Sequence, residues 1–245
     1  MGLLSFSRRL AQGWGLEVNR ANAMTTWRCR LPALLQQMDI GLVLDVGSND
    51  GGFASELLGN GYSGRILSFE PLPRVWQSVH AKAQSIGDGR WEVADRVALS
   101  DSKGVVAFNE AGNSVSSSIL PMLSEHEEAA PGSTTVAKVE VPTDTLDRVL
   151  EARGLMDSPA HLKLDVQGAE HLVLAGATGA LEGPIRSLQV EMSTVTLYEG
   201  QMLYPELDAW LRECGFELWD AIPGFRDSRT LRMLQFDGFY VRKSA

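Results

Sequence analysis

A glycine-rich turn near residue 47 has the composition of a cofactor-binding loop. An apolar run, 42–46, is followed by Gly-Ser-Asn-Asp-Gly-Gly over residues 47–52. When a strand ends in glycines before a helix, the chain turns tightly, and the missing Cβ atoms let a ligand approach the backbone. We therefore expect the turn after residue 46 to contact a bound cofactor.

The spacing of this turn bears on which cofactor it holds. A dinucleotide fingerprint is G-x-G-x-x-G, which brings a helix N-terminus against a pyrophosphate. Here the order is G-x-x-x-G, with Asp45 directly before it and Asn49 inside it. A carboxylate at this place repels a pyrophosphate but suits the cationic amino group of a methionine moiety. The spacing thus favours S-adenosylmethionine over NAD.

A second acidic residue follows the next predicted strand, 65–69. Glu70 lies about 20 residues after the glycine turn and precedes Pro71. An acid at this distance can accept hydrogen bonds from both hydroxyls of a ribose, whereas an NADP site favours a basic residue there. The alternative is that Glu70 only caps the helix that begins after Pro71.

A third group of polar residues surrounds the predicted strand 161–165. Because ligands bind beyond the carboxyl ends of parallel strands, Asp165 is expected near the reacting group. Gln167 and Gly168 make the following turn, and Glu170 falls in the first turn of the next helix, where the dipole favours an anion. Glu191 closes the strand 187–191 at the same edge of the sheet.

These motifs appear in the order seen in the FkbM family of methyltransferases, which the chain resembles over about residues 42–192. The segments that carry the resemblance are 45–51, 69–71, 98–101, 145–147, 163–170 and 189–191. The resemblance implies a class I methyltransferase fold and transfer of a methyl group to a hydroxyl oxygen. Members of the family act on sugars, polyketides and other secondary metabolites.

The resemblance also implies roles for individual residues. The residues expected to hold S-adenosylmethionine are Asp45, Gly47, Ser48, Asn49, Gly51, Glu70 and Pro71. Asp165 and Glu191 are expected to face the acceptor. A hydroxyl is weakly acidic, so a general base helps its attack; Asp165 is the first candidate and Glu191 the second. A metal-assisted route through these two carboxylates is a lesser alternative, because no third ligand is recognisable, and we expect no metal.

Two histidines near these motifs are weaker candidates for chemistry. His171 lies in the helix after Asp165 and is more typical of a surface or capping residue. His161 begins its strand at the end opposite the expected site. The serine-rich loop Ser114–Ser118 is either part of an acceptor pocket or a solvated turn. Four late aromatic residues either stack on a sugar ring or pack in the core: Trp210, Trp219, Phe225 and Tyr240.

The elements that position these residues alternate between strand and helix, which predicts a Rossmann-like α/β fold. We expect a seven-stranded, mostly parallel sheet with helices on both faces. Its strands are 42–46, 65–69, 91–94, 161–165, 187–191, 216–220 and 234–241, of which the last two are antiparallel partners. The helices are 52–58, 72–86, 144–152 (capped by Thr143), 169–175 and 205–214. Residues 41–245 form this domain, and an insertion at about 97–142 is expected to cover the site.

Residues 1–40 are expected to form a helical segment before the domain. Leu3, Phe6, Leu10 and Trp14 recur at helical spacing beside Arg8. Three roles remain open for this segment: packing on the core or on a dimer partner, contact with a membrane surface, or a lid over the substrate. A homodimer is accordingly possible.

Composition limits the classes of partner and function. The net charge is −9 and the pI about 5.0, which disfavours a nucleic-acid substrate. Two distant cysteines and no transmembrane-length apolar run indicate a cytoplasmic protein. The favoured function is an S-adenosylmethionine-dependent O-methyltransferase acting on a sugar, glycan or secondary metabolite. The alternatives are a non-catalytic interaction protein with the same fold and, less favoured, a nucleotide-dependent oxidoreductase.

Overall fold

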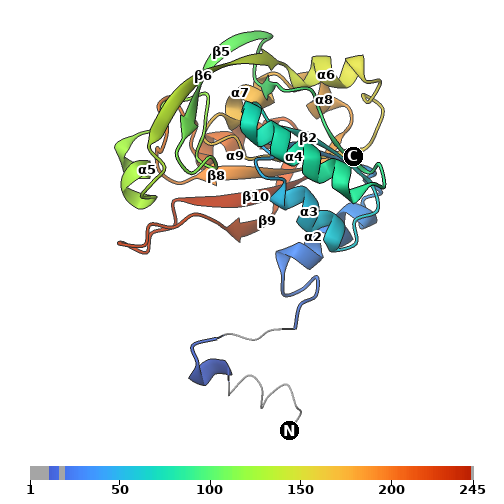
Figure 1. Ribbon diagram of the computed structural model, residues 1–245. Helices are drawn as coiled ribbons and strands as arrows, with labels where there is room; N and C mark the ends of the chain where they lie inside the picture. The colour runs from blue at the N-terminus through green and yellow to red at the C-terminus, as the bar shows by residue number, and fades with distance from the viewer. Residues whose placement is uncertain (1–10, 17–19, 244–245) are drawn as a thin grey trace.

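Seven strands form one central sheet in the order β3-β2-β1-β7-β8-β10-β9 (Figure 1). The computed structural model describes residues 11–16 and 20–243. Its strands are β1 (Leu42–Val46), β2 (Arg65–Phe69), β3 (Trp91–Val93), β7 (Ala160–Leu164), β8 (Ile185–Ser193), β9 (Phe216–Pro223) and β10 (Gln235–Arg242). β10 is antiparallel to both β8 and β9, and the other pairings are parallel. The predicted α/β fold, with its antiparallel last pair, is confirmed.

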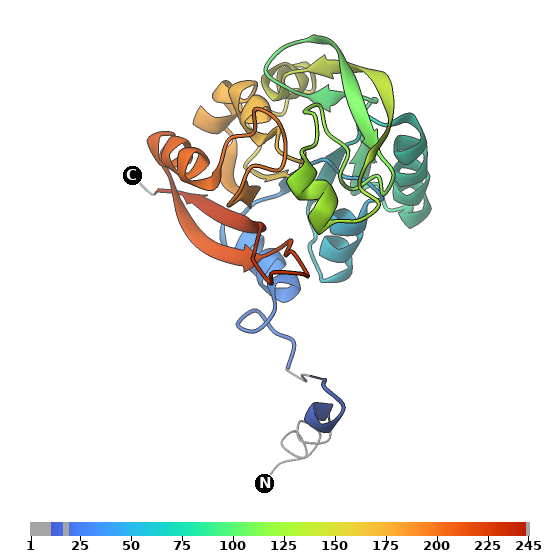
Figure 2. The same cartoon turned by 90° about the vertical axis from the view of Figure 1, so that its left-hand side faces the viewer.

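Helices cover both faces of this sheet, as the two views in Figures 1 and 2 show. One face packs on α2 (Trp27–Gln37), α3 (Gly52–Gly59) and α4 (Pro73–Ile86). The other face packs on α6 (Leu146–Ala152), α7 (Glu170–Ala175), α8 (Thr178–Glu182) and α9 (Tyr204–Glu213). Side chains of β1 alternate between these two cores, with Val43 on the first and Leu44 on the second. Burial on both faces explains why the central strands are short apolar runs.

The segment between β3 and α6 leaves the central sheet and forms a second, three-stranded sheet in the order β4-β6-β5. Its strands are β4 (Ala98–Leu99), β5 (Gly104–Ala111) and β6 (Thr135–Asp144), and α5 (Ser124–Ala129) lies between β5 and β6. Figure 2 shows β5, β6 and α5 in front of the carboxyl edge of the central sheet. This insertion therefore extends over the place where a ligand of the sheet is expected.

The helix predicted to begin at residue 144 begins later, and the prediction that Thr143 caps it is wrong. β6 continues to Asp144, because Thr143 and Asp144 pair with β4. α6 then starts at Leu146, and the Thr145 hydroxyl accepts a hydrogen bond from the backbone N–H of Arg148 at 3.3 Å. Thr143 is therefore a strand residue, and Thr145 is the cap.

The N-terminal segment is described only in part. Leu3, Phe6 and Leu10, on which the helical spacing rests, lie outside the described residues. Trp14 is 81% exposed, so it does not pack on the domain. Helix α2, which also falls within residues 1–40, does pack: the Trp27 ring meets the edge of Phe239 at a centroid distance of 5.3 Å. In the described part of the chain, no helix is long and apolar enough to cross a membrane.

Candidate active site

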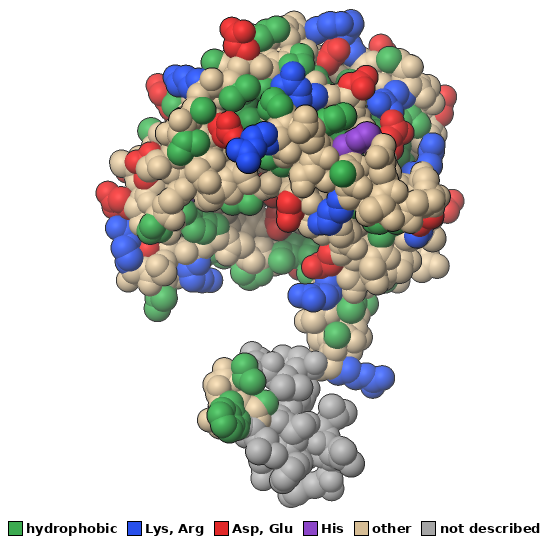
Figure 3. Space-filling view, in the orientation of Figure 1, with side chains coloured by type: hydrophobic (Ala, Val, Ile, Leu, Met, Phe, Trp, Pro, Cys, Tyr) green, Lys and Arg blue, Asp and Glu red, His purple; other side chains and the backbone are tan. Residues whose placement is uncertain are grey.

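A cavity of about 420 Å³ opens at the carboxyl ends of β1, β2 and β7. Figure 3 shows the molecule hollowed on one face, with an acidic side chain at the edge of the hollow. The central sheet supplies one wall and the insertion the other. Of the nine residues that the sequence assigned to cofactor binding or catalysis, seven line this cavity, namely Gly47, Ser48, Asn49, Glu70, Pro71, Asp165 and Glu191. Asp45 and Gly51 do not line it.

The glycine turn has the backbone that a close approach requires. Gly47 has φ of 80°, and a Cβ there would come within 1.9 Å of the backbone oxygen of Asp165, so only glycine fits between the two loops. Asn49 adopts φ of 43°, a left-handed conformation that is uncommon outside glycine. The hydroxyl oxygen of Ser48 is buried and has no hydrogen-bond partner among the described residues. A Cβ at Gly51 would come within 2.5 Å of the Trp91 ring, so the fold of the turn requires glycine there. Its contact with a cofactor stays a prediction.

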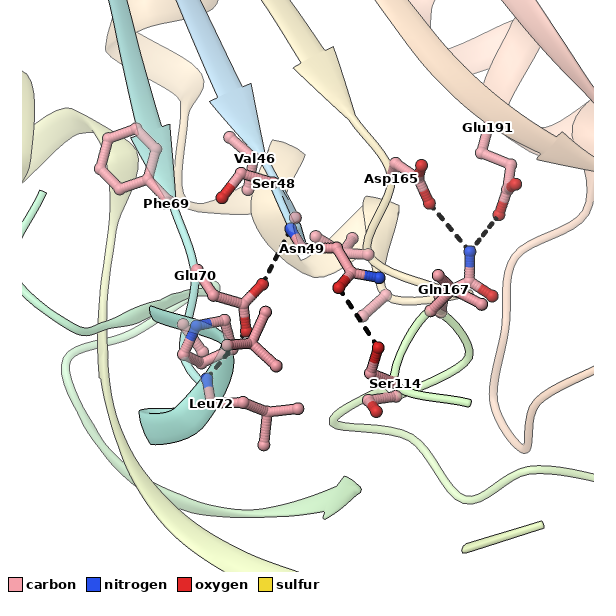
Figure 4. A pocket seen from close by; sticks show the side chains of 18 of the residues that line it. Val46, Ser48, Asn49, Phe69, Glu70, Leu72, Ser114, Asp165, Gln167 and Glu191 are labelled. Atoms are coloured by element: carbon pink, nitrogen blue, oxygen red, sulfur yellow. Dashed lines mark hydrogen bonds between the residues drawn. The ribbon is translucent and has the colours of Figure 1, made fainter. Parts of the chain in front are cut away.

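Glu70 connects the end of β2 to the glycine turn. Its carboxylate accepts hydrogen bonds from the backbone N–H of Asn49 at 3.0 Å and of Leu72 at 2.9 Å (Figure 4). Leu72 is the residue that precedes α4, so Glu70 also serves the capping function that the sequence left open. Burial raises the pKa of Glu70 to about 7, against the lowering effect of these two hydrogen bonds. Each oxygen retains a lone pair for a ligand hydroxyl.

Asp45 lies beneath the cavity, and its partner is a lysine. It is completely buried; the Ser68 hydroxyl donates to its Oδ2 at 2.9 Å, and Lys163 Nζ lies 3.5 Å from its Oδ1. Lys163 is also 3.4 Å from Oδ2 of Asp165 and lies over the ring of Phe53. Asp45 therefore orients the lysine that meets Asp165. Its direct contact with a cofactor stays a prediction.

Asp165 and Glu191 share one amide donor. The Gln167 side-chain amide donates to Oδ1 of Asp165 at 2.8 Å and to Oε2 of Glu191 at 2.9 Å, as Figure 4 shows. The amide of Gln235 also donates to the same oxygen of Glu191, at 2.6 Å. Asp165 directly follows β7, whereas Glu191 lies within β8, which runs on to Ser193. The two carboxylates that the sequence proposed thus come together at one edge of the cavity.

The two carboxylates differ in their electrostatic surroundings. Burial raises the pKa of Glu191 well above its ordinary value, and the neighbouring charges of Asp165, Glu170 and Asp237 add to this, against Lys163. Asp165 is more exposed and lies directly beside the ammonium group of Lys163. Burial acts to lower the pKa of Lys163, but the nearby carboxylates outweigh it and raise this pKa above its ordinary value. Lys163 is therefore a fixed positive charge beside Asp165.

The insertion and the loop after β9 complete the cavity. Ser114 donates to the side-chain oxygen of Asn49 at 3.3 Å, which ties the insertion to the glycine turn. Ser114 and Ser117 line the cavity, and residues 116–118 are buried, so the solvated-turn interpretation is wrong for this loop. Phe225 alone of the four late aromatic residues lines the cavity. The other three lie elsewhere: Trp210 at the core, Trp219 57% exposed, and Tyr240 buried with its hydroxyl on Asp208.

Neither histidine weighed from the sequence lines the cavity. His161 is fully buried within the sheet, where its Nδ1 is 2.9 Å from the hydroxyl of Ser187. His171 lies in α7. A different histidine, His126 of α5, does line the cavity and is 3% exposed. Sequence reasoning missed it because nothing in the insertion's local pattern shows which of its side chains turn toward the central sheet.

Lys163, Gln167 and Gln235 also line the cavity and were given no role there from the sequence. The first two lie inside the segment 163–170 that carried the resemblance, and Gln167 adopts φ of 55°, a conformation that is costly for a non-glycine residue. Because β7 alternates its side chains, Lys163 and Asp165 lie on the same side of the strand. This period-2 spacing is the sequence feature that could have indicated Lys163.

Comparison with known proteins gives the same class of enzyme. The chain matches the family model described as the methyltransferase FkbM domain over residues 45–218. It is 26% identical over 206 residues to the 2-O-methyltransferase NoeI of Sinorhizobium fredii (strain NBRC 101917 / NGR234), with 82% of each chain covered. Two solved structures are also similar. One is a TehB-like SAM-dependent methyltransferase from Corynebacterium glutamicum ATCC 13032 Kitasato, with 14% identity and a TM-score of 0.40, covering 98% of this chain and 96% of that one. The other is Aeropyrum pernix fibrillarin, with 16% identity and a TM-score of 0.45, covering 86% of this chain and 74% of that one.

A mostly parallel α/β sheet with a glycine turn after β1 and an acid after β2 is a Rossmann-like fold. This chain belongs to the FkbM family of methyltransferases. It is therefore a methyltransferase, and the oxidoreductase and non-catalytic alternatives are set aside.

Proposed function

We propose that the enzyme transfers the methyl group of S-adenosylmethionine to a hydroxyl oxygen of a sugar, a glycan or another hydroxylated metabolite. The observation that carries this is the pair of carboxylates, Asp165 and Glu191, linked by the amide of Gln167 at the edge of the cavity. A hydroxyl needs a proton acceptor when it attacks, and a carboxylate pair provides one. The relative named 2-O-methyltransferase NoeI supports oxygen as the methylated atom.

The cavity fits S-adenosylmethionine in its chemistry as well as its place. At its β2 end the lining is apolar, from Leu72, Val75, Val97, Leu99 and Phe108, which suits a flat purine. Glu70 lies beside this apolar end, where a ribose would follow the purine. The unpartnered Ser48 hydroxyl offers a further polar group at the glycine turn. We infer that these residues, with the backbone of Gly47 and Asn49, hold the cofactor.

The bound cofactor supplies an electrophilic methyl group on a sulfonium centre. Asp165 is proposed to accept the proton of the acceptor hydroxyl, because its carboxylate lines the cavity at the end of β7 beside the positive charge of Lys163. Glu191 has a different part. Both amide donors meet its Oε2, which leaves Oε1 for the acceptor, and its raised pKa lets it hold a proton at higher pH than an ordinary glutamate.

Water exclusion and alignment are expected to supply much of the rate enhancement. The insertion covers the carboxyl edge of the sheet, and the bond from Ser114 to Asn49 closes it onto the glycine turn. Gln167 fixes the two carboxylates relative to each other, and its own amide oxygen accepts a hydrogen bond from the Tyr198 hydroxyl at 3.0 Å. The proton acceptor is therefore held before substrate binds.

Isothermal titration and a transfer assay test this proposal. The full chain should bind S-adenosylmethionine and S-adenosylhomocysteine with micromolar affinity, and should not bind NADH. Radiolabelled S-adenosylmethionine should then label one or more members of a panel of methyl glycosides on oxygen. Binding of NADH, or label only on nitrogen acceptors such as amino sugars, would overturn the proposal.

A further inference from the structure

A histidine of the insertion lies in the cavity without a role in the chemistry above. His126 belongs to α5 and is almost fully buried, yet it lines the cavity. Its ring is packed edge-to-face on Tyr198 at a centroid distance of 5.3 Å and tilted on Phe225 at 5.5 Å. A buried imidazole between two aromatic rings has a fixed orientation, as a recognition group requires.

Both neighbours of His126 lead to the carboxylate pair. Tyr198 donates its hydroxyl to Gln167, whose amide holds Asp165 and Glu191. The backbone oxygen of Phe225 accepts the N–H of Gln235, whose side chain donates to Glu191. Since β8 and β10 lie on the side of β7 away from β2, His126 is at the opposite end of the cavity from Glu70. This is the end left for the methyl acceptor.

The hydrogen bonds of His126 determine which nitrogen carries its proton. Nδ1 is 3.1 Å from the hydroxyl oxygen of Ser133, a residue with no exposed surface. The same hydroxyl lies 3.5 Å from Sδ of Met122, to which it can donate its one hydrogen. In that arrangement, which we adopt as part of the proposal below, the Ser133 oxygen accepts from His126 and the proton sits on Nδ1. Burial lowers the pKa of His126, which keeps the ring neutral.

The second nitrogen, Nε2, is the available one. It has no hydrogen-bond partner among the described residues, and it is not one of the unpaired polar atoms sealed inside the protein. With the proton on Nδ1, Nε2 of this cavity-lining residue carries a free lone pair. A neutral nitrogen with a lone pair accepts a hydrogen bond from a hydroxyl but not from an ether oxygen, which has no hydrogen to donate.

We propose that His126 Nε2 accepts a hydrogen bond from a second hydroxyl of the methyl acceptor, one that is not itself methylated. The acceptor is then a polyol, with one hydroxyl at Asp165 and another at His126. This inference rests on the proposed function and narrows its substrate class. It also gives the insertion a direct part in substrate choice, through the relay Met122–Ser133–His126.

Nitrogen-15 NMR of the full chain labelled in histidine tests the relay without any substrate. The chain has four histidines, and loss of a signal in His126→Gln assigns that residue. The expected spectrum places the proton of His126 on Nδ1, and Ser133→Ala is expected to shift the tautomer balance toward Nε2–H. A wild-type ring protonated on Nε2 would overturn the inference, because Nε2 could then not accept.

A combined change of enzyme and substrate tests the contact itself. For a methyl glycoside that the enzyme methylates, His126→Phe should raise KM roughly tenfold, as expected for one lost hydrogen bond. Removing the contacted hydroxyl from the glycoside should raise the KM of the wild type by the same factor. It should not raise the KM of the His126→Phe variant any further. His126→Gln, whose amide oxygen can accept, should recover part of the loss, and S-adenosylhomocysteine binding should stay within about twofold.

The control is His80→Phe, a histidine stacked on Trp76 outside this cavity. Suppose that a glycoside is methylated, but that every deoxy analogue that raises KM in the wild type raises it equally in His126→Phe. The inference then fails while the proposed function stands. If the chain binds S-adenosylhomocysteine yet methylates only acceptors with a single hydroxyl, the inference that the acceptor is a polyol fails, while methyl transfer to oxygen stands. If no hydroxylated compound is methylated, both fail.

Discussion

The ammonium group of Lys163 lies 3.5 Å from the carboxylate of Asp45 inside the parallel sheet. The two are register partners on β7 and β1, and their side chains are 9% and 0% exposed. Ser68 of β2 donates to the other oxygen of Asp45, and the indole N–H of Trp91 in β3 donates to Ser68. A row of polar contacts therefore crosses four strands and ends at Asp165, the proposed proton acceptor.

Replacing Lys163 by Met should destabilise the protein by about 3–5 kcal/mol, because it leaves Asp45 buried without a counter-charge. Urea unfolding followed by circular dichroism measures this. The double variant Lys163→Met with Asp45→Asn removes both charges and should recover a large part of the loss. Lys138→Met, on an exposed residue of β6, is the control and should stay within about 0.5 kcal/mol. Additive losses in the double variant would mean that the two groups do not interact.

The position of Asp45 also shows where sequence reasoning reached its limit. Its place directly before the glycine turn indicated the correct loop, and from this we expected contact with the cofactor. Strand pairing adds what the loop alone does not show: because β1 lies between β2 and β7, the Asp45 side chain meets Ser68 and Lys163 below the cavity. Its contact with a cofactor stays a prediction. Which strands are neighbours depends on long-range pairing, which local pattern does not contain.

The central strands and long helices could be predicted because their burial leaves a clear pattern. Runs such as 42–46 and 160–164 are buried throughout, and α4 has the spacing of a half-buried helix. The short helices α5 and α8, of six and five residues, were not predicted. His126 was missed for this reason, because it belongs to α5.

Glu70→Ala should weaken binding of S-adenosylmethionine and S-adenosylhomocysteine by about 1–3 kcal/mol, the cost of hydrogen bonds to a charged group. Isothermal titration measures the change in Kd. Glu56→Ala removes an exposed carboxylate of α3 and serves as the control. Because Glu70 also accepts from the backbone of Asn49 and Leu72, the thermal midpoint of the variant should be recorded. Unchanged affinity in a folded variant would show that Glu70 only supports the turn.

Asp165→Asn should reduce kcat by about 10²- to 10⁴-fold, the range for loss of a general base. The amide cannot take the proton of the acceptor, but it keeps the size of the side chain. Cofactor affinity should change little, which titration with S-adenosylhomocysteine checks. Glu191→Gln is the matched comparison and should cost less, because Glu191 is assigned to hold the acceptor. A larger loss in Glu191→Gln than in Asp165→Asn would exchange the two roles.

Glu170 makes the stability of the fold depend on pH. It is 1% exposed, and its Oε1 accepts the backbone N–H groups of Val166 and Gly168 at 3.1 and 3.3 Å. Burial raises its pKa from 4.5 to about 7. At a pH between these two pKa values, Glu170 is ionised in the unfolded chain but keeps its proton in the folded protein. The contribution of Glu170 to stability is thus complete below pH 4.5 and is lost as the pH rises through 7.

Glu170→Gln should remove this dependence. A pKa difference of 2.5, from 4.5 to 7, corresponds to about 3 kcal/mol at about 1.4 kcal/mol per unit. The amide oxygen can keep the two backbone hydrogen bonds, and the amide does not ionise. We expect equal unfolding free energies for variant and wild type near pH 4, and a variant more stable by up to about 3 kcal/mol at pH 8. Glu182→Gln, an exposed residue at the end of α8, should follow the wild-type curve. Parallel curves for Glu170→Gln and wild type would show that Glu170 has the same pKa in the folded and unfolded states.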